Sequence, residues 1–125
     1  IGSISCGTVK SVSLSLLTNK GIVAGTSGLN WGQRDKRNRN EAYIRIPIQI
    51  ARQDFFPTDR HFTVLTDDGH QLILRAEQQN NKALTTPMNN SLLGEYFRNR
   101  LNLPNGHPVT KQDLERYGRT DVVFA

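Results

Sequence analysis

Cysteine is almost absent from this chain, and no long hydrophobic run occurs in it. Cys6 is the single cysteine among 125 residues, which excludes an intramolecular disulfide and a cysteine-based metal site. The histidines His61, His70 and His107 are scattered without the spacing of metal ligands. No apolar span or basic amphipathic helix suggests a membrane partner. We expect no metal, no other cofactor and, since no secretory signal is present, a cytoplasmic location.

The signatures of common catalytic sites are missing as well. The chain contains no Gly-x-Ser-x-Gly elbow and no glycine-rich phosphate loop followed by lysine. Four aspartates lie between residues 54 and 68, but no acidic-x-Lys tripeptide of a metal-dependent nuclease follows them. A His-x-Lys phosphodiesterase signature is absent too. We predict no catalytic residue in this chain, and we interpret Asp67 and Asp68 as part of a turn.

Positive charge is what the chain has in excess. Lys and Arg number 16 against 11 Asp and Glu, which gives a net charge of +5 and a pI near 9.8. This balance favours an anionic partner such as nucleic acid, but it carries no information about the fold. At this length we expect a single domain over residues 1–125. Because the chain begins with Ile1 and ends in the apolar run Val122–Ala125, we interpret it as a fragment of a longer protein.

The stretch from Ser27 to Pro47 is the first candidate binding segment. Its cations cannot be core residues, because the desolvation of several unpaired charges would cost too much. Residues Tyr43–Ile46 alternate between apolar and polar, which indicates a strand and therefore an arm anchored on a sheet. Arg, Lys, Asn and Gln contact phosphates and base edges in DNA. The candidate contacts in this arm are Asn30, Trp31, Gln33, Arg34, Lys36, Arg37, Asn38, Arg39 and Asn40.

These candidates have different expected roles. Lys36 and some of the arginines are expected to neutralise phosphates, whereas Arg34, Arg37 and Arg39 are candidates for bidentate contacts with guanine. The amide side chains suit adenine or water-mediated contacts. Trp31, the only tryptophan, is expected to buttress the arm, because the major groove of a duplex offers few exposed base faces.

A second polar loop is the other candidate binding segment. Most loops of such composition are merely solvated turns, and the interest of this one lies in its combination with the arm. Two loops rich in amides and cations, both projecting from one sheet, suit a grip on a duplex from two sides. The candidate contacts in the second loop are Gln78, Gln79, Asn80, Asn81 and Lys82.

The rest of the chain predicts a mainly β domain with short helices. Serines alternate with Val12, Leu14 and Leu16, as in a half-buried strand. The Asp-Gly pair at residues 68–69 lies between two apolar runs and predicts a hairpin. The expected strands are residues 12–16, 43–46, 62–64, 72–76, 83–85 and 122–124, and the expected helical segments are residues 47–51, 91–101 and 111–117.

The two longer helices carry signals at their ends. Asn90 is expected to cap the first, in which Arg98 and Asn99 should point outward. Thr110 and Asp113 predict a capping box for the second helix. Its C-terminal cap should be Gly118. The residues expected to face the core from the first helix are Leu93, Phe97 and Leu101, and the helix-surface residues considered as extra contacts to the DNA backbone are Arg98, Arg100 and Arg119.

Four motifs resemble one known family. Ser27–Arg34 (SGLNWGQR), Glu41–Ile44, Asn89–Leu101 (NNSLLGEYFRNRL) and Asp113–Asp121 (DLERYGRTD) are similar to the C-terminal recognition domain of NgoFVII-type restriction endonucleases. The resemblance extends from about residue 14 to residue 124. These bacterial type II enzymes join an N-terminal phospholipase-D-like nuclease to a B3-like DNA-binding domain. The segment from residue 45 to residue 57 also resembles plant B3 transcription-factor domains, more weakly.

This resemblance implies both a fold and a function. It implies a seven-stranded open pseudobarrel with two short helices, whose N-arm and C-arm grip the major groove of double-stranded DNA. Here the N-arm corresponds to Gly28–Asn40 and the C-arm to Gln78–Lys82, the same loops that composition indicates. It further implies that this domain recognises a specific sequence in the bacterial cytoplasm, while a separate N-terminal nuclease domain of the parent chain cleaves.

Two other classes of function stay open. A binder of single-stranded or structured RNA would need exposed aromatic side chains for stacking, and the two polar loops carry only Trp31. A protein-interaction domain would use the basic arm to meet an acidic partner. Binding to DNA without sequence preference is the third alternative.

Overall fold

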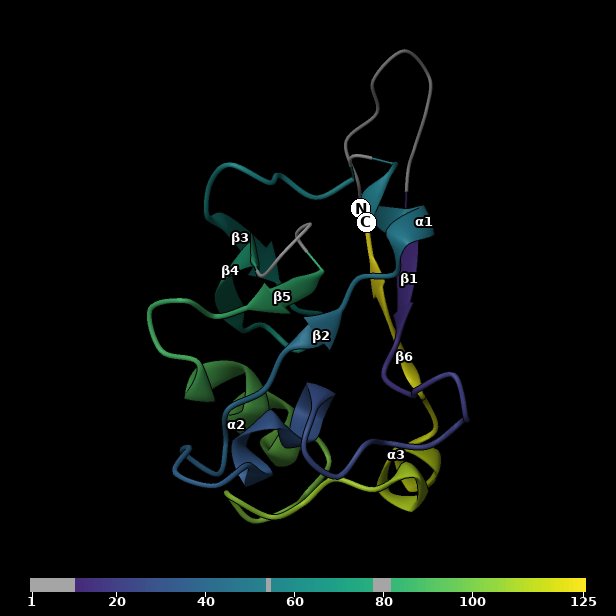
Figure 1. Ribbon diagram of the computed structural model, residues 1–125, viewed down its shortest axis with the longest axis vertical. Coiled ribbons are helices and arrows are strands. Elements are labelled where there is room, and N and C mark those ends of the chain that lie inside the picture. The colour runs from purple at the N-terminus through teal and green to yellow at the C-terminus, as the bar shows by residue number, and fades with distance from the viewer. Residues whose placement is uncertain (1–10, 54, 78–81) are drawn as a thin grey trace.

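Two antiparallel sheets form the body of the molecule, in a computed structural model that describes residues 11–53, 55–77 and 82–125. In the smaller sheet, β1 (Val12–Ser15) pairs with β6 (Asp121–Phe124), so distant parts of the sequence lie side by side (Figure 1). The larger sheet has the order β2-β5-β4-β3. Its strands are β2 (Ile44–Arg45), β3 (Phe62–Leu65), β4 (Gln71–Glu77) and β5 (Ala83–Thr85).

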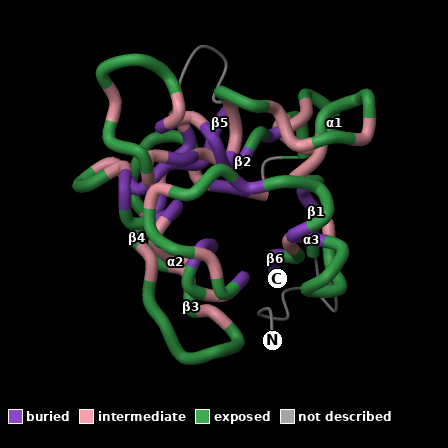
Figure 2. The backbone as a smooth tube through the Cα atoms, turned by 90° about the horizontal axis from the view of Figure 1, so that it is seen from below, coloured by how far each residue is buried: buried purple, intermediate pink, exposed green. Residues whose placement is uncertain are grey.

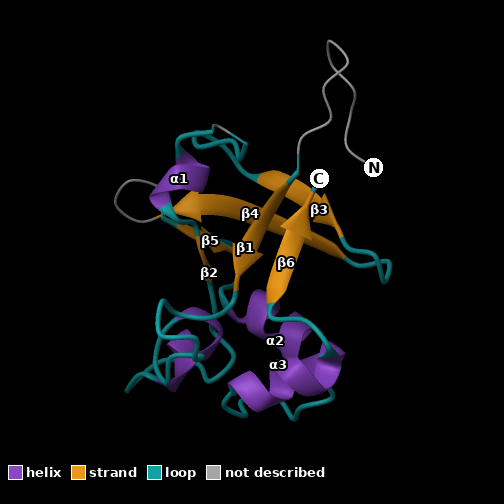
Figure 3. Cartoon of the chain, turned by 90° about the vertical axis from the view of Figure 1, so that its right-hand side faces the viewer, coloured by secondary structure: helices purple, strands orange, loops and turns teal. Residues whose placement is uncertain are grey.

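Four short helical elements in the described ranges complete the fold. In Figure 3 the 3-10 helix η1, α2 and α3 lie below the strands, whereas α1 lies at the opposite end of the sheets. Within the described residues, no helix is long and apolar enough to cross a membrane. The helical elements are η1 (Gly28–Gln33), α1 (Ile48–Ala51), α2 (Ser91–Arg100) and α3 (Lys111–Tyr117).

The prediction of a mainly β fold with short helices is therefore confirmed. The described residues form six strands, one fewer than the seven that the resemblance implies, and these strands do not close into a barrel. The expected hairpin is present, with β3 and β4 paired around a turn in which Gly69 has a φ of +86°. That backbone conformation is accessible to glycine and strained for most other residues, so Asp-Gly was a reliable signal.

The core lies between the sheets and extends to the helices below them. Figure 2 shows the buried positions gathered on the strands and on the helices that face them, with the loops exposed. Phe56, after α1, packs its ring 5.9 Å from Phe62 of β3 and 5.1 Å from Phe124 of β6, measured between ring centroids. This one side chain therefore bridges the two sheets.

The caps predicted for α3 are observed, whereas the cap predicted for α2 is not. Thr110 and Asp113 form the predicted capping box, and Gly118 ends α3 with a φ of 105°, so both predictions are confirmed. The cap predicted for α2 is wrong: Asn90 has helical backbone angles and no side-chain capping bond. Instead the Oδ1 atom of Asn89 accepts a 3.0 Å hydrogen bond from the amide of Ser91. Neighbouring asparagines offer the same chemistry, so composition alone did not separate them.

Arg98 of α2 points into the core, opposite to the predicted direction. Leu93, Phe97 and Leu101 face the core as expected, but Arg98 is fully buried, so the outward orientation predicted for it is wrong. Gly94, one turn earlier on the same helix face, leaves space for the guanidinium, which donates hydrogen bonds to three main-chain carbonyls. These carbonyls replace the water that an exposed arginine would keep.

Candidate nucleic-acid interface

All the net positive charge of the chain lies in one segment. Residues 20–52 contain seven Lys and Arg against two Asp and Glu, a net charge of +5, and this equals the net charge of the whole chain. The rest of the sequence holds nine cations and nine carboxylates, which balance. The segment covers η1, the arm (residues 30–40), β2 and α1. Its cations are Lys20, Arg34, Lys36, Arg37, Arg39, Arg45 and Arg52.

Ion pairs are also distributed differently between this segment and the rest of the chain. Among the described residues, the only ion pair inside the segment joins Arg37 to Glu41, with 2.6 Å between Nε and Oε1. Elsewhere the cations of α2, α3 and the neighbouring loops are mostly paired with carboxylates. The other pairs are Arg60–Asp59, His70–Asp68, Arg100 with Asp67 and Asp68, Lys111–Glu115, Arg116–Asp113 and Arg119–Asp121. A face with uncompensated cations produces the positive potential that attracts a polyanion.

The arm folds back on itself and is not an extended strand. The amide of Gly32 donates to the carbonyl of Glu41 at 2.8 Å, and the amide of Glu41 donates to the carbonyl of Asn38 at 3.0 Å. A Cβ atom at Gly32 would collide with the Asn38 carbonyl oxygen, so only glycine permits this close approach. At the tip, Lys36 has a φ of 65°, a left-handed conformation typical of tight turns.

Three of the predicted contact residues are used inside the fold. The side chain of Asn30 is 2% exposed; its Nδ2 atom donates to the carbonyls of Ala24 (2.9 Å) and Val109 (2.7 Å), and its Oδ1 atom accepts from the Val109 amide. The Nε2 atom of Gln33 donates to the carbonyls of Arg39 and Gly106. The Oδ1 atom of Asn40 accepts a 2.6 Å hydrogen bond from the Gly106 amide.

Trp31 and Arg37 form a stacked pair within the arm. The guanidinium carbon of Arg37 lies 3.8 Å from the centroid of the Trp31 ring, while Tyr43 meets the indole edge-on at 5.4 Å. Trp31 is half-buried by these neighbours. Cation–π attraction and the ion pair to Glu41 both hold the Arg37 guanidinium in place.

The remaining four arm candidates are exposed. The side chain of Arg34 donates to the carbonyl of Thr26, and that of Arg39 donates to the carbonyl of Gln33, so each keeps further donors directed to solvent. Among the described residues, Lys36 has no hydrogen-bond or ion-pair partner. The exposed set is Arg34, Lys36, Asn38 and Arg39.

Only the last residue of the second loop, Lys82, belongs to the described part of the chain. Gln78, Gln79, Asn80 and Asn81, four of its five predicted contacts, lie outside the described residues. Lys82 is exposed and directly precedes β5. Its carbonyl accepts a 2.6 Å hydrogen bond from the amide of Ile46, so the loop ends beside β2. The arm leads into β2 from the other direction, which places one end of each loop against the same strand.

A groove runs along this strand from the arm to the second loop. One part, of about 240 Å³, is lined by Gly28 and Tyr43 at the base of the arm. The adjoining part, of about 510 Å³, reaches α1 and Lys82. Arg45 lines both parts, together with Thr18 and other residues that follow β1, and no carboxylate among the described residues lines either part. Arg45 was not among the sequence candidates, although it is the outward residue of an alternating strand that directly follows the arm.

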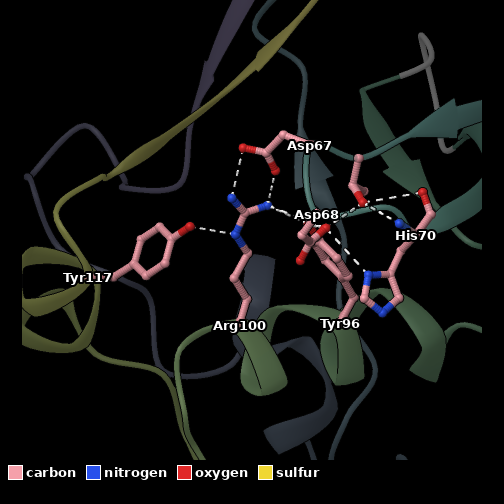
Figure 4. A network of polar contacts seen from close by, with 7 residues as sticks. Asp67, Asp68, His70, Tyr96, Arg100 and Tyr117 are labelled. Carbon is pink, nitrogen blue, oxygen red and sulfur yellow. Dashed lines mark hydrogen bonds and ion pairs between the residues drawn. The ribbon is translucent and has the colours of Figure 1, made fainter.

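The marked shifts in acidity lie away from this groove, around Arg100. Its guanidinium donates to both carboxylate oxygens of Asp67 and to the hydroxyls of Tyr96 and Tyr117 (Figure 4). The hydrogen bond from Arg100 lowers the pKa of Asp67, and the Thr66 hydroxyl, with smaller contributions from Tyr96 and His70, lowers the pKa of Asp68 to about 2. This network ties the β3–β4 turn to α2 and α3.

Arg100 and Arg119 are therefore engaged with carboxylates of the fold, and Arg98 is buried. Within the described part of the chain, no three His, Cys, Asp or Glu side chains are placed to hold a metal ion. The site that the structure assembles is a basic, carboxylate-poor surface formed by the arm, β2 and the end of the second loop.

One family model matches nearly the whole chain. The model of the family described as the NgoFVII C-terminal B3-like DNA-binding domain matches residues 5–125. No curated protein matches the chain significantly. The resemblance noted from four sequence motifs is confirmed.

Proposed function

This chain belongs to the NgoFVII C-terminal B3-like DNA-binding domain family, and from that membership we propose that it recognises a specific sequence in double-stranded DNA. One observation carries the proposal beyond the family description: the whole net charge of +5 resides in residues 20–52, the segment that forms the arm and part of the groove wall. A polyanion with a regular backbone is the partner that such a surface fits.

The arm is the element that reads the bases. Its exposed tip enters the major groove, where Arg34 and Arg39 offer bidentate donors to guanine and Asn38 offers an amide to adenine. Lys36, a point charge on a flexible stem, contacts a phosphate. The second loop, Gln78–Lys82, is assigned to contacts with the same major groove, as the C-arm of the family. Two such loops hold the duplex between them.

The protein groove along β2 accommodates the DNA backbone. Arg45 pairs with Ala83 in the sheet, and Lys82 directly precedes β5. Both cations line the same part of the groove, so both are available to phosphates of one strand. Contacts to phosphates set the register of the protein on the duplex and carry no sequence information. Asn30, Gln33, Asn40 and the stacked pair of Trp31 and Arg37 act by fixing the shape of the arm.

The two sheets support the B3-type pseudobarrel in an open form. β1 lies beside β2, and Phe56 packs against both β3 and β6 at the other side. The resulting order β6-β1-β2-β5-β4-β3 wraps around one core. We assign these residues to one domain of a bacterial cytoplasmic type II restriction endonuclease, whose cleavage chemistry belongs to a separate N-terminal nuclease domain.

A competition experiment distinguishes the proposed partner from the alternatives. Labelled duplex DNA is displaced by unlabelled duplex DNA, single-stranded DNA or double-stranded RNA over a series of salt concentrations. We expect duplex DNA to compete best, and the logarithm of affinity to fall with the logarithm of salt concentration by about 0.9 per phosphate contact. Preference for a single strand would favour an RNA-type binder, and no binding even at low salt would favour a protein partner.

A further inference from the structure

The loop between α2 and α3, residues 104–109, contacts both ends of the arm. At the start of the arm, Val109 exchanges two hydrogen bonds of 2.7 Å with the side chain of Asn30. At the end of the arm, the amide of Gly106 donates to the Oδ1 atom of Asn40 at 2.6 Å. The position of this loop therefore determines how far apart the two ends of the arm are held.

Hydrogen bonds from Arg98 connect this loop to η1 and α2. Its Nε atom donates to the carbonyl of His107 in the loop at 2.8 Å. Its Nη2 atom donates to the carbonyl of Leu29 in η1, and its Nη1 atom donates to the carbonyl of Gly94 in α2, both at 3.3 Å. One planar guanidinium thus joins three segments, and two of them lead directly into the arm or support it.

The end of the arm rests on the same helix. A Cβ atom at Gly94 would collide with the carbonyl oxygen of Asn40, so the arm lies directly against the backbone of α2 at that point. Any shift of α2 against η1 would move the arm as well. Arg98, which bonds across this junction, is the side chain best placed to prevent such a shift.

Stability alone does not explain why an arginine is buried at position 98, because the removal of its charge from water costs free energy. The side chain is fully buried and no carboxylate pairs with it among the described residues, and burial lowers the pKa of its guanidinium. Apolar residues of similar volume often replace buried charges without loss of stability. A rigid set of donors directed at three carbonyls instead supplies exact placement, and base contacts require placement to within about 0.5 Å.

We propose that Arg98 is a positioning residue for DNA recognition: through the α2–α3 loop and η1 it holds the arm in the shape that presents its exposed side chains to the duplex. This inference rests on the proposed function, because the arm must read DNA for its shape to matter. Arg98 itself does not touch the DNA.

Arg98→Lys tests this role with the charge retained. Lysine has a single nitrogen and cannot span three carbonyls, so the arm should loosen while the number of cations is unchanged. Trp31 is the only tryptophan and reports on the arm directly. We expect acrylamide to quench its fluorescence more strongly in the free variant. The preference for a duplex selected from a random pool over a scrambled duplex should fall about tenfold, comparable to one lost base contact, with the salt dependence retained.

Val12→Ala is the matched control, because Val12 is a core residue of the β1–β6 sheet. It lowers stability without touching the arm, so Trp31 quenching and sequence preference should stay at wild-type values. A folded Arg98→Lys variant with wild-type preference and quenching would overturn the proposal. So would an equal loss of preference in Val12→Ala at matched stability, since the effect would then be one of stability alone.

Gly106→Ala provides an independent test if Arg98→Lys fails to fold. Gly106 has a φ of +80°, which is strained for alanine, and a Cβ atom there would lie 3.2 Å from the Cβ atom of Arg39, so the substitution should disturb the α2–α3 loop where it supports the arm. The same loss of preference is expected, and its absence would contradict the positioning role. A wild-type chain without any sequence preference would instead refute the proposed function, before either variant is compared.

Discussion

The guanidinium carbon of Arg37 lies 3.8 Å from the centroid of the Trp31 ring, and the Nε atom of the same side chain lies 2.6 Å from a carboxylate oxygen of Glu41. A guanidinium held on two sides is a component of the folded arm. This relationship separates Arg37 from Arg34 and Arg39, which composition had placed in one class of guanine contacts.

Arg37→Ala should therefore act on stability first. Loss of the cation–π contact and of the ion pair to Glu41 should reduce the free energy of unfolding by about 1 kcal/mol. Urea unfolding followed by Trp31 fluorescence measures the change. Arg34→Ala is the matched control and should stay within about 0.5 kcal/mol of the wild type. Unchanged stability with relaxed specificity at one base pair would show that Arg37 contacts guanine after all.

Arg45 and Lys82 should bind the DNA backbone without reading sequence. Arg45→Ala and Lys82→Ala should each weaken binding to all duplexes by the same factor and reduce the salt slope by about 1. Fluorescence anisotropy titrations at several salt concentrations measure both quantities. Arg60→Ala, which removes an arginine paired with Asp59, should change neither. A loss confined to the preferred sequence would contradict the assignment to phosphates.

Asn30 should be a stability residue, although the sequence suggested a DNA contact. Asn30→Ala leaves the amide and carbonyl of Val109 and the carbonyl of Ala24 without their partners, at a cost of about 3 kcal/mol. Asn38→Ala, a change of the same type at an exposed site, should alter stability by less than about 0.5 kcal/mol. Equal stabilities of the two variants by urea unfolding would refute this role for Asn30.

Acid should destabilise the domain, in part through the network around Arg100. The pKa values of Asp67 and Asp68 are lowered in the folded state, that of Asp68 to about 2. Carboxylates with lowered pKa values stabilise the fold above the unfolded-state pKa near 4 and lose this contribution as the pH falls toward 2. The free energy of unfolding should therefore decrease over that range.

Arg100→Gln should flatten this decrease, because Asp67 then loses the hydrogen bond that chiefly lowers its pKa. Arg60→Gln, an arginine outside the network, should leave the pH profile unchanged. Thermal melts between pH 2 and pH 5 compare the three proteins. Identical slopes for Arg100→Gln and the wild type would show that Arg100 contributes nothing to the acid sensitivity.

Features with purely local causes were predictable from the sequence. The turn at Gly69 needs a positive φ, and the capping box of α3 needs Thr110 and Asp113 three residues apart. Both depend on neighbours along the chain. The confinement of charge to residues 20–52 is also a property of the sequence, and so is the position of the arm within it.

Features that depend on remote partners were not predictable. Arg98 is buried because Gly94 leaves space and because Leu29, 69 residues away, supplies a carbonyl. Asn30 is buried because Val109, 79 residues away, pairs with its amide. Polar side chains of the same type point to solvent at Asn38 and Asn99. The division of the arm into residues that shape it and residues that present donors required the three-dimensional structure.

Selection of bound sequences from a random pool of duplex DNA tests the central claim most directly. The 125-residue chain is used at moderate salt without added metal, and the selected pool is sequenced. We expect enrichment of one short motif, and loss of enrichment at single positions of that motif for Arg39→Ala. Binding without any enriched motif would contradict sequence-specific recognition and reduce the arm to a non-specific basic loop.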